Sequence, residues 1–96
     1  MTRRQAIVVI DLRNVRTAKT LHRLLMKSLG FPDWYGRNWD AFWDAITGLV
    51  EMPIVLRLNG WEEFASRLSR DARLMKACLD GMSVQFPQLA SQVEYG

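Results

Sequence analysis

The sequence predicts a single two-layer α/β domain over residues 1–96, in which a small three-stranded parallel sheet packs against about four helices. Apolar runs of strand length occur at residues 6–10 and 53–58, and segments with helical spacing lie between and after them. Strands separated by helices imply right-handed crossovers and therefore a parallel sheet. A chain of 96 residues is also long enough to bury one hydrophobic core.

The first expected elements are a strand and a helix. Residues 6–10 read Ala-Ile-Val-Val-Ile, a run typical of a strand buried on both faces. After a polar connection, the leucines from position 21 to position 29 recur at spacings of three and four residues, which predicts a helix. We expect Thr17 to cap its start and Gly30 to end it in the left-handed conformation.

A second helix is expected from Asn38, a good N-cap, to Gly48, a natural stop. Its residues form two stripes. The apolar stripe consists of Trp39, Phe42, Trp43 and Ile46. We expect Trp39, Phe42 and Ile46 in the core, and Trp43 half in the core and half at an interface. The polar stripe consists of Asp40, Asp44 and Thr47.

The second half of the chain completes the alternation. Residues 53–58 predict a strand that begins at a proline, and an Asn-Gly turn leads into a short helix over 61–68. A further helix is expected over about 71–84, before Pro87, and residues 91–95 are the candidate third strand. The expected order is strand, two helices, strand, two helices, strand.

The composition excludes several classes of site. A single cysteine, Cys78, allows no internal disulfide, and with His22 as the only histidine we expect no metal site and no cofactor. We expect Cys78 to be a small core residue and His22 to be exposed on the first helix. No apolar run reaches the roughly 18 residues of a membrane span, and the N-terminal apolar run is too short for a signal peptide, so a cytoplasmic protein is expected.

The charges are distributed unevenly. Residues 31–56 hold four acidic side chains and one basic one, a net charge of −3, although the whole chain carries +3. Within this window Asp40 and Asp44 lie one helical turn apart, where like charges repel by a few tenths of a kcal/mol. Such a pair does not stabilise the fold, so we expect it to bind a positively charged partner.

The same window carries a recognisable motif. It reads Pro-Asp-Trp-Tyr-Gly-Arg-Asn-Trp-Asp-Ala-Phe-Trp-Asp over 32–44, then Thr47-Gly48, then Val-Glu-Met-Pro-Ile-Val-Leu over 50–56. This pattern resembles the barstar family of intracellular ribonuclease inhibitors. The motif covers about a quarter of the chain, and the order of elements agrees over the first 70 residues.

The resemblance implies a function and a site. Barstar-like inhibitors insert their second helix and the loop before it into a ribonuclease active site, where carboxylates take the place of RNA phosphates. Asp44 matches the central carboxylate and Asp40 its companion, while Trp34 lies where the family has a tyrosine that packs on the catalytic histidine. The other matching interface positions are Asn38, Trp43, Thr47 and Gly48, and Asp80 is the nearest candidate for an outlying acid on the last helix.

The resemblance therefore predicts an immunity-type inhibitor that is no enzyme, is monomeric when free, and forms a 1:1 complex with a ribonuclease or related nuclease toxin. The chain departs from the family pattern at three places. Trp34 lacks the tyrosine hydroxyl, Arg37 replaces an acid, and Leu49 replaces a tryptophan. These differences bear on which nuclease is the partner.

A nucleic-acid-binding module is the first alternative. The sequence pI is about 9.5, and basic side chains gather on the first connection and helix. These are Arg13, Arg16, Lys19, Arg23 and Lys27. The aromatic cluster, however, coincides with acids, whereas a base-stacking platform has Lys and Arg between its rings.

A paired-carboxylate enzyme is the second alternative, with Asp40 and Asp44 as acid and base. Such a site needs one carboxyl group in an apolar pocket that raises its pKa. Two acids on an exposed helix face do not meet that requirement, and no third catalytic residue accompanies them.

Overall fold

A computed structural model describes residues 4–96. Three strands and four α-helices alternate in the predicted order, and a π-helical turn, η1, extends α2. The elements are β1 (Ile7–Asp11), α1 (Ala18–Leu29), α2 (Trp39–Asp44), η1 (Ala45–Leu49), β2 (Val55–Asn59), α3 (Trp61–Arg67), α4 (Ser69–Gln85) and β3 (Gln92–Tyr95). Within the described part of the chain, no helix is long and apolar enough to cross a membrane.

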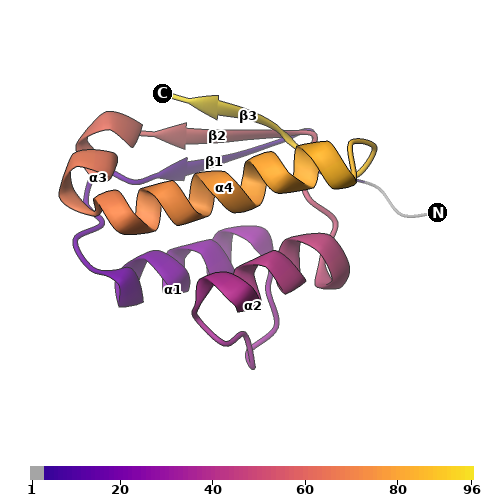
Figure 1. Ribbon diagram of the computed structural model, residues 1–96, viewed down its shortest axis with the longest axis horizontal. Helices are drawn as coiled ribbons and strands as arrows, with labels where there is room; N and C mark the ends of the chain where they lie inside the picture. The colour runs from indigo at the N-terminus through magenta and orange to yellow at the C-terminus, as the bar shows by residue number, and fades with distance from the viewer. Residues whose placement is uncertain (1–3) are drawn as a thin grey trace.

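The three strands form one parallel sheet in the order β1-β2-β3, as predicted. Helices α1, α2 and α4 lie on one side of this sheet (Figure 1). The expectation that the first strand is buried on both faces is wrong. Ile10 points to the helices and is 1% exposed, whereas Ile7 and Val9 are 43% and 49% exposed on the open face.

The hydrophobic core fills the space between the sheet and the helices. Leu56 and Leu58 of β2, Phe42 of α2 and Phe64 of α3 are completely buried. Each such side chain contributes roughly 1.5–3 kcal/mol relative to an exposed position. Because the core holds α2 in place, the polar stripe of α2 has a fixed position on the surface.

The predicted helix caps are present. The Thr17 side chain accepts a hydrogen bond from the backbone N–H of Thr20, and Gly30 ends α1 with φ 73°. The second helix does not stop at Gly48 as predicted. It continues through η1, where the N–H of Val50 bonds to the carbonyl of Ala45, so Gly48 lies inside the last turn.

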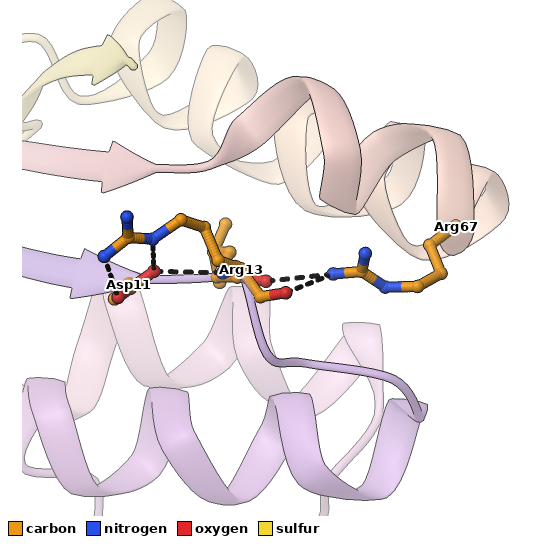
Figure 2. A network of polar contacts seen from close by, with 4 residues as sticks. Asp11, Arg13 and Arg67 are labelled. Carbon is orange, nitrogen blue, oxygen red and sulfur yellow. Dashed lines mark hydrogen bonds and ion pairs between the residues drawn. The ribbon is translucent and has the colours of Figure 1, made fainter.

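An arginine network fixes the connection between β1 and α1 (Figure 2). From α3, the Arg67 guanidinium donates to the carbonyl of Arg13 at 2.7 Å and to that of Val15 at 3.0 Å. The Arg13 guanidinium in turn makes two hydrogen bonds to the Asp11 carboxylate, at 2.8 and 2.9 Å. Gly60, with φ 75°, passes so close to Arg13 that a Cβ atom there would collide with its side chain. The connection to α1 is therefore held in place by α3, which follows β2 at the same end of the parallel sheet.

Candidate functional site

The acidic stripe of α2 is exposed and has no ion-pair partner within residues 4–96. Asp40 lies in the first turn of α2 and Asp44 at its last residue. Asn38 sets the start of the helix, since its side-chain oxygen accepts the N–H of Ala41 at 2.7 Å and its amide donates to the carbonyl of Gly36 at 3.3 Å. The predicted N-cap is thus confirmed, and it determines where both carboxylates stand.

A groove of about 650 Å³ runs between α2 and α4, with both carboxylates in its lining. The lining comprises Trp39, Asp40, Trp43 and Asp44 from α2 and Leu74, Ala77, Cys78, Gly81 and Gln85 from α4. Gly81 permits the close packing of the two helices, because a Cβ atom there would lie 3.3 Å from the Trp43 ring. Trp43 is half-buried and also packs near Phe86, with ring centroids 6.4 Å apart. Its indole is shared between the core and the groove.

The loop before α2 presents one large aromatic side chain to solvent. Trp34 is 71% exposed, whereas Phe31 and Tyr35 on either side of it are 6% and 5% exposed. The rings of Phe31 and Tyr35 pack against each other with centroids 4.8 Å apart. These two anchors hold the loop on the core and leave the Trp34 side chain exposed to solvent.

His22 is buried, so the expectation that it is exposed is wrong. It is 3% exposed, its Nδ1 lies 2.7 Å from the Tyr35 hydroxyl, and its ring packs on Trp39 with centroids 4.5 Å apart. Burial lowers the pKa of His22, an effect that the charge of Asp71 partly offsets. The sequence contained a sign of this position, because His22 precedes Leu25 and Leu29 at the spacings of the buried stripe.

Thr47 and Gly48 follow the acidic stripe in η1. The Thr47 hydroxyl donates to the carbonyl of Trp43 at 2.6 Å, which supports the wider turn. Gly48 is exposed, and a Cβ atom there would meet nothing within 4 Å. The structure thus places these two residues one turn after Asp44, with open space in front of Gly48.

Asp80 lies apart from the groove. Its carboxylate accepts a hydrogen bond from the Lys76 ammonium group at 2.7 Å, and it is absent from the groove lining. The Lys76 nitrogen lies 5.7 Å from the centre of the Tyr95 ring. Burial, and then the charge of Asp80, raise the pKa of Tyr95 to about 12. Asp80 therefore lies on the β3 side of α4, and its part in an interface stays a prediction.

The chemistry of this surface is that of an exposed anion rather than of a proton-transfer site. Both carboxylates line the groove but are exposed to solvent, so neither is enclosed by its apolar side chains. Cys78 is half-buried at the groove, where burial raises the pKa of its thiol and so disfavours the reactive thiolate. Among residues 4–96 no three His, Cys, Asp or Glu side chains gather in a way that could hold a metal ion.

Comparison with known proteins agrees with the geometry. A family model described as "Barstar (barnase inhibitor)" matches residues 5–94, from the first strand to the third. The chain belongs to the barstar family. This confirms the resemblance seen in the motif over residues 32–56, and extends it over the C-terminal helix and strand.

The chain is also similar to a protein of Bacillus subtilis (strain 168) named "Putative ribonuclease inhibitor YrdF". The two sequences are 46% identical over 55 residues, which is 57% of this chain and 60% of the relative. The aligned stretch thus spans less than two thirds of the relative's length.

Proposed function

We propose that this protein is an inhibitor of a ribonuclease and that it blocks the enzyme's active site with α2 and the loop before it. The observation that carries the proposal is the pair of exposed carboxylates, Asp40 and Asp44, on a helix held by the core. Neither has a counter-charge within residues 4–96, although the chain as a whole is basic. The family and the name of the relative support the same function.

The mechanism follows from what a ribonuclease active site must bind. Such a site gathers cationic side chains to hold the RNA phosphates, and two carboxylates one turn apart offer it similar charge without a bond to cleave. Asp44 is the central carboxylate and Asp40 its companion, while Trp34 provides a flat ring to pack beside the catalytic residues. Where a charge pair is desolvated at the centre of such an interface, removing one of its partners greatly weakens binding.

Four further residues complete the proposed surface. Trp43 borders Asp44 along the groove, and Thr47 and Gly48 offer a hydroxyl and an accessible backbone beyond it. Asn38 holds the start of the helix. Asp80 is a candidate only for the periphery, where it would speed association through its charge.

Preorganisation favours tight binding on this surface. The N-cap at Asn38, the buried anchors Phe31 and Tyr35, and the close packing at Gly81 all hold the loop and helix before any partner arrives. A surface that is already ordered loses little conformational entropy on binding. We propose a 1:1 complex of one inhibitor with one nuclease, formed in the cytoplasm by a chain that is monomeric when free.

The test compares three immobilised proteins: wild type, Asp44→Asn, and Glu63→Gln as a control in which an exposed acid on α3 is neutralised. Each is exposed to the ribonucleases of the source organism, and RNA cleavage is measured in the eluate with and without added inhibitor. Wild type and Glu63→Gln should retain a ribonuclease and suppress its activity, whereas Asp44→Asn should not. Equal retention and inhibition by Asp44→Asn would refute the role of the acidic helix.

A further inference from the structure

The starts of three helices lie around one hollow of the molecule. Helices α1, α2 and α4 all run from left to right in Figure 1, with α1 and α4 starting at the left end and α2 further in. Their first residues, with the end of the loop before α2, enclose a hollow of about 440 Å³. We call this hollow the three-helix pocket. It shares only Trp39 with the acidic groove.

The pocket carries a surplus of positive charge. Its lining includes Lys19 from α1, Arg37 from the loop and Arg70 from α4, all of them exposed and none ion-paired within residues 4–96. Asp71 is the single acid in the lining, and its carboxylate accepts the indole N–H of Trp39 at 3.0 Å. Three positive charges against one negative charge leave a net charge of +2 around the opening.

Helix stability does not explain these cations. Lys19 and Arg70 are the second residues of α1 and α4, where the partial positive charge of the helix start disfavours a cation by roughly 0.3–1 kcal/mol. The first turn of α1 contains no acidic residue that could offset the cost. An external anion would be attracted both by the cations and by the helix starts.

His22 supplies a buried polar group at the base of the pocket. It lines the pocket although it is only 3% exposed, and its Nδ1 is bonded to the Tyr35 hydroxyl. That hydroxyl makes no other hydrogen bond within residues 4–96, so we assign its proton to the bond with Nδ1, which places the proton of the histidine on Nε2. Nε2 has no hydrogen-bond partner within residues 4–96, so its N–H is an unused donor on a residue that lines the pocket.

We propose that the three-helix pocket binds a phosphate group, either as free phosphate or as the terminal phosphate of a nucleotide. A phosphate dianion matches the net charge of +2 and has enough acceptor oxygens for several converging donors. Two guanidinium groups can each bind it through paired hydrogen bonds, and the ammonium group of Lys19 and the imidazole N–H of His22 add single donors. A carboxylate has about four lone-pair sites for these six hydrogen bonds and carries a single negative charge, so it matches the pocket less well.

The test uses the single histidine as a spectroscopic probe. The imidazole resonances of His22 are followed by NMR while inorganic phosphate is added to the full chain at constant ionic strength, with chloride as the balancing anion. A saturable shift is expected, together with a rise in the pKa of His22, because a bound dianion stabilises the imidazolium. A His22 signal that does not respond to phosphate, or responds equally to chloride, would overturn the proposal.

Variants separate the pocket from the rest of the basic surface. Arg70→Gln and Lys19→Gln should each weaken phosphate binding, by about tenfold for the arginine because charge-assisted hydrogen bonds are lost. Arg23→Gln removes an exposed charge from α1 outside the pocket lining and should leave binding unchanged. Circular dichroism checks that each variant is folded. Unchanged binding in both pocket variants would refute the assignment.

Two further titrations define the source of the phosphate and the independence of the site. Tighter binding of adenosine 5′-monophosphate than of phosphate, with adenosine alone inactive, would identify a nucleotide; equal binding would identify free phosphate. Asp44→Asn, which should abolish nuclease inhibition, should leave the phosphate titration unchanged. The proposed function and this inference can therefore fail separately.

Discussion

Asp44→Asn should stabilise the free protein slightly, although we expect it to abolish inhibition. Asp40 and Asp44 are both exposed, lie four residues apart, and have no counter-charge within residues 4–96. Two like charges roughly 6 Å apart in water repel by about 0.7 kcal/mol, and screening at physiological salt reduces this to about 0.3 kcal/mol. At about 0.01 M salt the screening is weaker, and the repulsion should reach about 0.6 kcal/mol.

Asp40→Asn provides the matched comparison. It removes the same repulsion, but Asp40 also lies in the first turn of α2, where the helix dipole favours a negative charge by roughly 0.3–1 kcal/mol. The two effects oppose each other, so Asp40→Asn should be neutral or slightly destabilising. A gain in the free energy of unfolding for Asp44→Asn, beside no gain for Asp40→Asn, is expected only if Asp44 has no structural role.

The assay is urea unfolding followed by tryptophan fluorescence at low and at physiological salt. Asp44→Asn should unfold at a higher urea concentration than wild type, and the difference should shrink as salt is added. A loss of more than about 1 kcal/mol at both salt concentrations is far outside the effect of a surface position. That result would show that the carboxylate serves folding, and it would refute the argument that it is kept for a partner.

Three other substitutions and one pH profile test the support beneath the site. Phe42→Ala should lower the free energy of unfolding by about 3–5 kcal/mol because its fully buried ring leaves a cavity, and a loss under 1 kcal/mol in thermal unfolding would contradict that packing. Asn38→Ala should cost about 1 kcal/mol through loss of the helix cap, whereas an unchanged urea midpoint would mean the cap is dispensable. Gly60→Ala should destabilise through its positive φ and the collision with Arg13, which a melting temperature at or above that of wild type would disprove. Burial lowers the pKa of His22 in the folded state below its usual 6.5, so the unfolded chain takes up the proton first as the pH falls. The contribution of the neutral histidine to the free energy of unfolding is therefore complete above about pH 6.5 and declines below it. Urea midpoints between pH 7.5 and 5 should show this decline, and a His22→Phe variant with the same slope would assign it to other groups.

The order of elements could be predicted because local signals and tertiary packing agree. Thr17, Gly30 and Asn38 occupy the cap positions expected of them, and each proline lies outside a helix. The exposed face of β1 was not predicted, because it depends on how the helices pack on the sheet. The open face of β1 follows from helices covering a single side of the sheet, and a run such as residues 6–10 does not report how many sides are covered.

The site could be predicted only where its residues are neighbours in sequence. Asp40, Asp44, Thr47 and Gly48 follow one another in the motif, and the structure places them on α2 and η1 as consecutive surface positions. The π-helical turn was missed because a single extra residue in a turn leaves no clear periodic trace.

Contacts between residues from different segments could not be predicted. The spacing of His22 from Leu25 and Leu29 indicates the buried stripe of α1, but its contacts with Tyr35 and Trp39, which come from another segment, leave no trace in the sequence. The three-helix pocket likewise combines residues from α1, the loop before α2 and α4. Basic residues such as Lys19 and Arg70 are far apart in sequence, and their convergence follows from α1 and α4 starting at the same end.

Inhibition kinetics distinguish whether α2 occupies the active site of a ribonuclease or binds the enzyme elsewhere. The rate of RNA cleavage by the captured nuclease is measured against inhibitor concentration at several RNA concentrations. If the carboxylates take the place of RNA phosphates, RNA must compete with the inhibitor, and the apparent inhibition constant should rise linearly with the RNA concentration. An inhibition constant that does not change with RNA concentration would contradict the claim, because inhibitor and substrate would then bind at different places.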